Sequence, residues 1–169
     1  MLVPLLVVLI VADTETASYA AVVVFVVGAL SDGLDGYLAR RNDQVTTTGA
    51  WLDPLSDKLL VAAPVLTLTA MGEFPVWAAV IIIVREVAVV VLRIWLGRRG
   101  VSMPASELAK LKTGAQLVAI TLYLWPLSEG AGPAREIALA IAVVITVVSG
   151  VEYLFSVPRR LREAGEARS

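Results

Sequence analysis

Six hydrophobic stretches, separated by short polar connections, constrain the fold of this 169-residue chain more than any other feature. A helix needs about 20 residues to cross the apolar core of a bilayer. The first stretch is shorter and is typical of the second half of a spanning helix; a signal peptide is the alternative, but no basic region precedes it. We therefore predict an all-α polytopic membrane protein in one domain, residues 1–169, with a six-transmembrane-helix bundle whose first helix is N-terminally truncated. The predicted spans cover residues 1–12, 17–40, 50–71, 74–97, 108–127 and 136–157.

The composition agrees with a membrane protein and narrows the chemistry. Hydrophobic residues make up 58% of the chain and charged residues 17%, whereas a soluble domain carries about 25% charged residues. The absence of cysteine and histidine excludes thiolate catalysis, Ser-His-Asp triads and Cys or His metal sites. A metal ion would have to be a hard cation held by oxygen. The net charge of −1 provides no basic field for nucleic acid, so we expect no nucleic-acid partner.

If successive spans alternate in direction, the polar connections fall into two groups on opposite sides of the membrane, and these groups differ in charge. Of the arginines and lysines near the span ends, one side carries only Arg135. This asymmetry predicts that the basic side, with both termini, faces the cytoplasm from the inner or plasma membrane. The basic side carries Arg40, Arg41, Arg98, Arg99, Lys110, Lys112, Arg159, Arg160, Arg162 and Arg168.

Four aspartates lie close to the cytoplasmic ends of the second and third predicted spans. Asp32 and Asp35 are spaced i,i+3, and Asp53 and Asp57 are spaced i,i+4, so each pair shares one face of its helix. The 12-residue connection from Arg41 to Leu52, which includes the basic turn, predicts antiparallel neighbours whose carboxylates meet. Converging carboxylates need cations between them, and Mg²⁺ or Mn²⁺ fits oxygen ligands. The alternative is that these aspartates cap helices and pair with Arg40, Arg41 and Lys58.

Two hard metal ions at a membrane surface suit one reaction class in particular. Mg²⁺ typically binds a few carboxylates together with substrate phosphates, and a pair of such ions can clamp both oxygens of an in-line displacement. The small residues Gly33, Gly36 and Ala39 leave backbone space for a nucleotide. We therefore predict phosphoryl or phosphatidyl transfer at the cytoplasmic face.

One string joins these residues. Asp32-Gly33-Leu34-Asp35-Gly36-Tyr37-Leu38-Ala39-Arg40 is followed by Gly49, Asp53 and Asp57. It resembles, without mismatch, the signature D-x2-D-G-x2-A-R-x8-G-x3-D-x3-D of the CDP-alcohol phosphatidyltransferase family. The resemblance implies a six-helix membrane enzyme in which an alcohol attacks the lipid-side phosphate of CDP-diacylglycerol and CMP leaves. It also implies membrane lipids as surroundings and a homodimer.

The resemblance further implies roles for individual residues. Asp32, Asp35, Asp53 and Asp57 would bind two ions of Mg²⁺ or Mn²⁺, and Asp57 would also act as the general base. Asp32 with Gly36, Ala39 and Arg40 would bind the nucleotide.

The acceptor alcohol is indicated by strings further along the chain. Val84-Arg85-Glu86-Val87, Leu92-Arg93 and the string from Ala109 to Gln116 are similar to the family's subgroup whose acceptor is glycerol 3-phosphate. The predicted acceptor-phosphate residues are Arg85, Arg93, Lys110, Lys112 and Thr113.

Several alternatives stay open at this point. Lys110 and Lys112 could be simple membrane-surface anchors, and Arg85 could pair with Glu86. The acceptor could instead be inositol phosphate, or phosphatidylglycerol in the formation of cardiolipin. An ion transporter and an inactive paralogue are the remaining readings.

Overall fold

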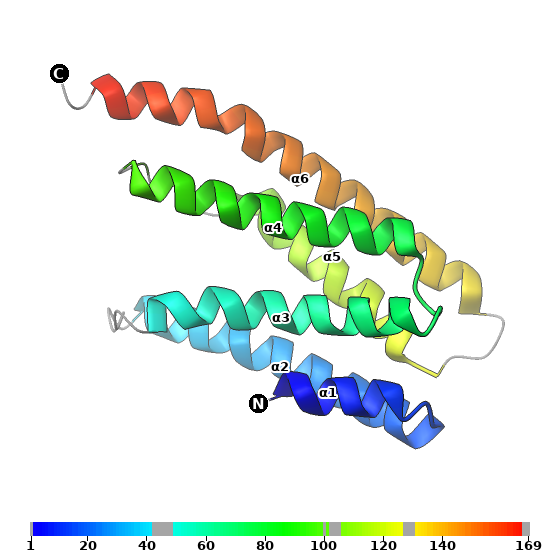
Figure 1. Cartoon of the computed structure of the whole chain (residues 1–169). Coiled ribbons are helices and arrows are strands. Elements are labelled where there is room, and N and C mark those ends of the chain that lie inside the picture. The colour runs from blue at the N-terminus through cyan, green and yellow to red at the C-terminus, as the bar shows by residue number, and fades with distance from the viewer. Residues whose placement is uncertain (1, 42–48, 100, 102–105, 127–130, 167–169) are drawn as a thin grey trace.

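The described part of the chain is entirely helical. The structure, a computed structural model, describes residues 2–41, 49–99, 101, 106–126 and 131–166, and the side chains of 2–31, 58–99, 101, 106–126 and 131–161. Those residues form six helices and no strand, as predicted (Figure 1). The helices are α1 (Leu2–Val11), α2 (Glu15–Arg41), α3 (Gly49–Ala70), α4 (Val76–Arg98), α5 (Glu107–Leu124) and α6 (Gly132–Glu166).

The predicted polar breaks are where the first helices end. Thr14 begins α2 by accepting a hydrogen bond on its hydroxyl from the Ala17 backbone N–H at 3.3 Å, as an N-cap residue does. After α3, Gly72 adopts a φ of +80°, a conformation that glycine adopts without the cost that a Cβ imposes. The backbone N–H of Glu73 then donates back to the carbonyl of Leu68 at 2.9 Å. These local signals are readable from the sequence, which explains the agreement in boundaries.

The last helix is longer than its predicted span. The predicted span covers residues 136–157, whereas α6 begins at Gly132 and continues through Pro158 to Glu166. A proline inside a helix removes one backbone hydrogen bond and crowds the preceding turn. The hydrogen bonds on either side of that position can still form, so the helix continues into the basic tail.

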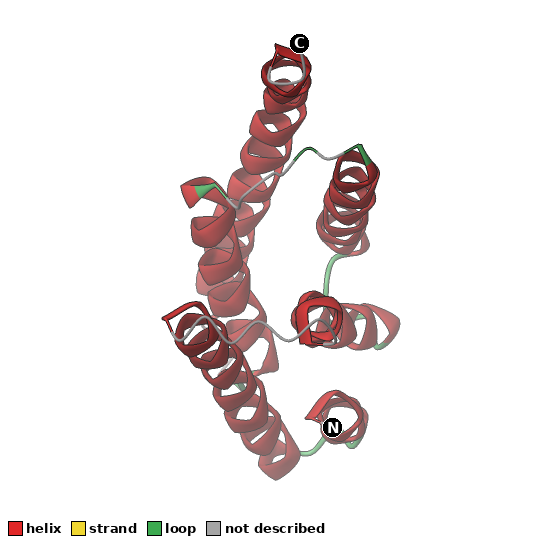
Figure 2. Cartoon of the chain, turned by 90° about the vertical axis from the view of Figure 1, so that its left-hand side faces the viewer, coloured by secondary structure: helices red, strands yellow, loops and turns green. Residues whose placement is uncertain are grey.

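The helices alternate in direction and form a closed arrangement (Figures 1 and 2). Helix α1 packs on α2 and α3, α2 packs on α5, α5 on α6, α6 on α4, and α4 on α3. Helices α2 and α3 also contact each other, and α3 contacts α5. This order brings the C-terminal end of α2 and the N-terminal end of α3 to the end of the bundle at which α4 ends (Figure 1).

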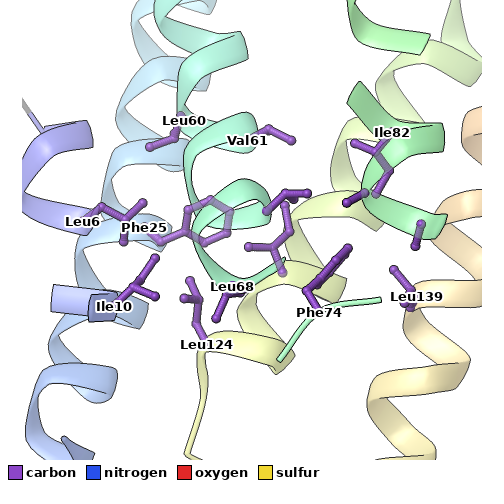
Figure 3. Packing of buried hydrophobic residues seen from close by; sticks show 14 of the residues in the cluster. Leu6, Ile10, Phe25, Leu60, Val61, Leu68, Phe74, Ile82, Leu124 and Leu139 are labelled. Carbon is purple, nitrogen blue, oxygen red and sulfur yellow. The ribbon is translucent and has the colours of Figure 1, made fainter. Parts of the chain in front are cut away.

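The apolar core fills the space between these helices toward the other end. Phe25 of α2 and Leu6 of α1 are completely buried, and Val65 and Leu68 of α3 and Ile82 of α4 join them (Figure 3). Because helices from all parts of the chain contribute to one cluster, the core fixes their relative positions. The polar residues described below are therefore held by a packed scaffold.

The outer surface of the bundle is strongly apolar. One helix of the described chain, α6 over Gly132–Leu161, is long and apolar enough to cross a membrane, and Leu2–Val11, Glu15–Ser31 and Lys58–Ala70 are shorter apolar helices. So many exposed large apolar side chains are unusual for a water-soluble monomer of this size. Exposed large apolar side chains include Val8, Val23, Val27, Val80, Val84, Val118, Ile137, Val144 and Phe155.

Candidate functional site

The four predicted metal ligands lie at one end of the bundle. Asp32 and Asp35 are in α2, and Asp53 and Asp57 are in α3. The two helices contact each other and run in opposite directions, so these residues share one end of the molecule (Figure 1). Their side chains are outside the described part of the structure, as are those of the predicted nucleotide residues Gly36, Ala39 and Arg40. A set of four carboxylates at one end of a helix pair is a donor set that fits hard divalent cations. Among the described residues there is no group of three or more potential metal-binding side chains.

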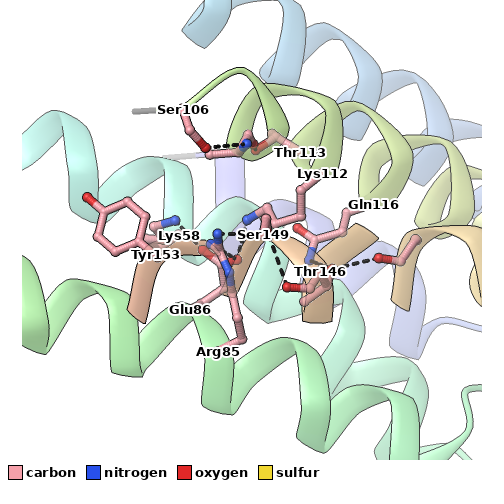
Figure 4. A network of polar contacts seen from close by, with 12 residues as sticks. Lys58, Arg85, Glu86, Ser106, Lys112, Thr113, Gln116, Thr146, Ser149 and Tyr153 are labelled. Atoms are coloured by element: carbon pink, nitrogen blue, oxygen red, sulfur yellow. Dashed lines mark hydrogen bonds and ion pairs between the residues drawn. The ribbon is translucent and has the colours of Figure 1, made fainter. Parts of the chain in front are cut away.

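A buried ionic cluster, formed by Lys58, Arg85, Glu86 and Lys112, lies between α3, α4 and α5 (Figure 4). The Glu86 carboxylate accepts from the ammonium groups of Lys58 and Lys112, one on each oxygen. The guanidinium of Arg85 donates to the same carboxylate at 3.2 Å. The side chains of Lys112 and Glu86 are 3% and 9% exposed, whereas that of Lys58 is 35% exposed. The cluster is therefore open to solvent on the α3 side and closed on the α5 side.

A fourth helix, α6, binds the other side of the Arg85 guanidinium, away from Glu86. A second nitrogen of the Arg85 guanidinium donates to the Ser149 hydroxyl at 3.0 Å, and that hydroxyl donates to the carbonyl of Thr146. The neighbouring Gly150 leaves room for the arginine, because a Cβ at that position would lie 3.3 Å from Arg85 Cγ. Arg85 is thus fixed at both ends of its guanidinium.

A second polar pair continues this network toward the core. The Gln116 amide nitrogen donates to the Thr146 hydroxyl at 3.0 Å, and both residues are essentially buried. Two buried atoms here have no hydrogen-bond partner within the described residues, Arg85 Nε and Gln116 Oε1. Buried polar atoms are normally paired, so these two leave a free donor and a free acceptor inside the site.

Further along α4, Arg93 makes a separate contact with α6. Its Nε donates to the Tyr153 hydroxyl at 2.6 Å, and its guanidinium carbon lies 5.4 Å from the centre of the tyrosine ring. The residue before Tyr153 in α6 is Glu152, whose carboxylate accepts from the Ser106 hydroxyl at 2.8 Å. These contacts tie the ends of α4, α5 and α6 together at the end of the bundle that carries the aspartates.

The predicted acceptor residues therefore fall into two groups. Arg85 and Lys112 meet on Glu86, and Arg93 lies about 12 Å further along the same helix axis. Lys110 and Thr113 are instead exposed on α5: Lys110 pairs with Glu107 at 2.7 Å, and Thr113 donates to the Ala109 carbonyl. The structure buries Lys112 and most of the Arg85 side chain, whereas Arg93, Lys110 and Thr113 are exposed.

The structure also adds residues that the sequence analysis had not placed in the site. Glu86 is the centre of the cluster, Lys58 is a third cation, and Ser149 orients Arg85. Glu86 is the one acidic residue in the apolar stretch 74–97, and an isolated charge of this kind usually marks a functional residue. Lys58 directly follows the last aspartate of the motif, but nothing in the sequence connects Ser149 with Arg85.

The charges in the cluster do not balance. Among the side chains that the structure describes, three cations share one carboxylate, which leaves two net positive charges in this part of the cluster. Burying charge without a partner is costly, so an unbalanced cationic cluster favours binding of an anion. A dianion of about the size of a phosphate group would neutralise it.

A pocket of about 450 Å³ lies elsewhere on the molecule, where α1 meets α2 and α5 approaches α6. It is lined by Asp13, Glu15, Glu73 and Arg135 among others, and none of the predicted site residues lines it. The Arg135 guanidinium is already bound to the carbonyls of Leu122 and Trp125. We therefore place the candidate site at the aspartate end.

Comparison with known proteins gives consistent matches over nearly the whole chain. The family model described as CDP-alcohol phosphatidyltransferase matches residues 1–148. A Mycobacterium tuberculosis protein named "Probable phosphatidylglycerophosphate synthase" is 40% identical over 154 residues, which cover 91% of this chain and 72% of the relative. Proteins named CDP-diacylglycerol–glycerol-3-phosphate 3-phosphatidyltransferase are similar too. The Bacillus subtilis protein is 41% identical over 140 residues (81% of this chain, 72% of the relative). The Escherichia coli K12 protein is 36% identical over 160 residues, which cover 90% of this chain and 86% of the relative.

Proposed function

Because the chain belongs to the CDP-alcohol phosphatidyltransferase family, we propose that it transfers the phosphatidyl group of CDP-diacylglycerol to glycerol 3-phosphate. The hydroxyl oxygen of the acceptor forms a bond to the lipid-side phosphorus, the bond from that phosphorus to CMP breaks, and the hydroxyl proton goes to a base. The relatives carry this activity in their names. The observation in this chain that carries the choice of acceptor is the buried cluster with its two net positive charges.

The aspartate end of the bundle would bind the nucleotide and perform the transfer. Asp32, Asp35, Asp53 and Asp57 would hold two ions of Mg²⁺ or Mn²⁺, which neutralise phosphate charge when bound. Asp57 would take the proton of the acceptor hydroxyl. Gly36, Ala39 and Arg40, with Asp32, would bind the CDP group, as the match to the family signature implies.

The cationic cluster would hold the acceptor by its phosphate. Lys112 and Arg85 are buried and partly neutralised by Glu86, so they keep attraction for an anion. Two unit charges 4 Å apart interact by about 4 kcal/mol at an effective dielectric constant of 20, so each cation near the phosphate would offset part of the repulsion by the carboxylates. Arg93 lies further toward the aspartate end and would contact the acceptor from that side. Lys110 and Thr113 would serve as an outer, solvent-exposed extension of the same pocket.

We propose that the bundle spans the membrane six times with the site at the cytoplasmic face. The alternating helices and the exposed apolar side chains support this arrangement (Figure 1). The charge asymmetry also supports it: Arg98, Arg99 and Lys110 lie near the aspartate end, and Arg135 lies at the other end. A cytoplasmic site would have access to water-soluble glycerol 3-phosphate and to the CDP group. The homodimer stays a prediction.

An acceptor panel tests the proposed function. The purified protein receives CDP-diacylglycerol with glycerol 3-phosphate, inositol phosphate, free inositol, serine or phosphatidylglycerol, and CMP release is measured. We expect release with glycerol 3-phosphate. Preference for inositol phosphate would keep the phosphate site but change the acceptor, whereas preference for a neutral alcohol, serine or phosphatidylglycerol would contradict the role of the cluster.

A further inference from the structure

We propose that Glu86 is a positioning residue that aims Lys112 and Arg85 at the acceptor phosphate. The inference rests on the proposed function and assigns to Glu86 a role separate from metal binding, nucleotide binding and proton transfer. It is drawn from the way one carboxylate is shared among cations from three helices (Figure 4).

The contacts of Glu86 show what it holds. Its Oε1 accepts from both Lys112 and Arg85, and its Oε2 accepts from Lys58. Lysine and arginine side chains are long and rotate freely, so in the absence of a fixed partner they populate many positions. A single buried acceptor on α4 limits Lys112 to one direction from α5 and Arg85 to one direction along its own helix.

The number of cations argues that the role goes beyond a structural ion pair. A carboxylate buried for structure needs one well-placed cation, and each further buried cation costs desolvation. Here two further cations are present, and one of them, Arg85, is also held by Ser149 and keeps a buried, unpartnered Nε. An excess of oriented donors around one carboxylate is what a site for a second anion requires.

The consequence of removing Glu86 follows from the same charges. Without the carboxylate, three cations would be close together with no counter-charge among the described side chains, and repulsion would drive the two lysines apart. Fewer donors would then face the acceptor phosphate. The nucleotide half of the site, which is built from α2 and the start of α3, would keep its residues.

The experiment compares Glu86→Gln and Glu86→Asp with the matched control Glu107→Gln. Glu107 is also a carboxylate paired with a lysine of α5, but its side chain is 83% exposed. For each purified protein, kcat and the KM values for glycerol 3-phosphate and CDP-diacylglycerol are measured, together with the thermal unfolding midpoint. The wild-type values establish separately that glycerol 3-phosphate is the acceptor, so failure of the proposed function is visible before any variant is compared.

We expect Glu86→Gln to raise KM for glycerol 3-phosphate by about tenfold or more, with KM for CDP-diacylglycerol changed less than about twofold. Glu86→Asp keeps the charge on a shorter side chain, so its KM should lie between those of the wild type and Glu86→Gln. Glu107→Gln breaks only an exposed ion pair, so it should change KM for glycerol 3-phosphate far less than Glu86→Gln does. Equal changes in both KM values, or a lower unfolding midpoint with unchanged KM values, would overturn the proposal. If Glu86→Gln does not fold, Glu86→Asp decides by the same comparison.

Discussion

Replacing Gly150 by alanine would test whether the position of Arg85 controls acceptor binding. The added Cβ would lie 3.3 Å from Arg85 Cγ and 4.0 Å from its Nε, so the arginine must move by a few tenths of an ångström. Its bond to the Glu86 carboxylate is already 3.2 Å long. A shift of that size away from the carboxylate takes the distance to about 3.5 Å, where a hydrogen bond contributes little.

The magnitude follows from that weakened bond. A hydrogen bond to a charged group contributes about 1.5–3 kcal/mol, so partial loss costs on the order of 1 kcal/mol. A factor of ten corresponds to about 1.4 kcal/mol, and we therefore expect KM for glycerol 3-phosphate to rise about fivefold. The assay is steady-state CMP release at saturating CDP-diacylglycerol.

Gly114→Ala is the matched control, because Gly114 is also inside a helix and a Cβ there has nothing within 4 Å. Both substitutions remove a glycine from a helix interior, which stabilises a helix by about 1 kcal/mol. We expect Gly114→Ala to keep the wild-type KM and to raise the unfolding midpoint. Equal KM values for the two variants would refute the reasoning that Arg85 is held at a fixed position by contact with α6.

Four further predictions concern other parts of the site. Asp57→Asn should reduce turnover by about 10²–10⁴-fold, the range for a general base, while binding of CDP-diacylglycerol is kept; near-normal turnover would exclude Asp57 as the base. Chelation with EDTA should abolish CMP release and added Mg²⁺ or Mn²⁺ should restore it, so full activity in chelator would contradict a metal-dependent reaction. Tyr153→Phe removes the acceptor of the Arg93 hydrogen bond and should raise KM for glycerol 3-phosphate several-fold; an unchanged KM would remove Arg93 from the acceptor pocket. A topology reporter fused after Ser169 should be cytoplasmic, and a reporter on the opposite side would invert the proposed orientation.

The elements of this fold could be predicted from the sequence because their signals are local. Apolar runs define the helices, and Thr14 and Gly72 act within one turn of the helix ends that they set. The last helix extends beyond its predicted span, residues 136–157, because a proline changes the cost of a helix without forbidding it. Alternation of the helices then follows from the short connections between them.

The candidate site could be predicted in part, because its residues are joined by contacts distant in the sequence. Arg85 and Lys112 were predicted from the short sequence strings that contain them. The pairing of Lys112 with Glu86 and of Arg85 with Ser149 spans 26 and 64 residues. Such pairings depend on which helices pack together, and apolar runs in the sequence carry little information about that. The separation of Lys110 from Lys112 had a local cause, since two residues along a helix lie on different faces.

The position of Lys58 links the two halves of the proposed reaction. Lys58 directly follows Asp57 in α3, so the backbone of one helix, with about 3.8 Å between consecutive Cα atoms, sets the distance between the proposed base and the cationic cluster. Lys58 in turn joins α3 to Glu86 of α4, and Glu86 joins it to Lys112 of α5. An in-line displacement requires the acceptor hydroxyl to be positioned within a fraction of an ångström of its attack geometry. A site that holds the acceptor phosphate through rigid helices, with α3 carrying both the base and a cation of the cluster, provides that precision without depending on a loop.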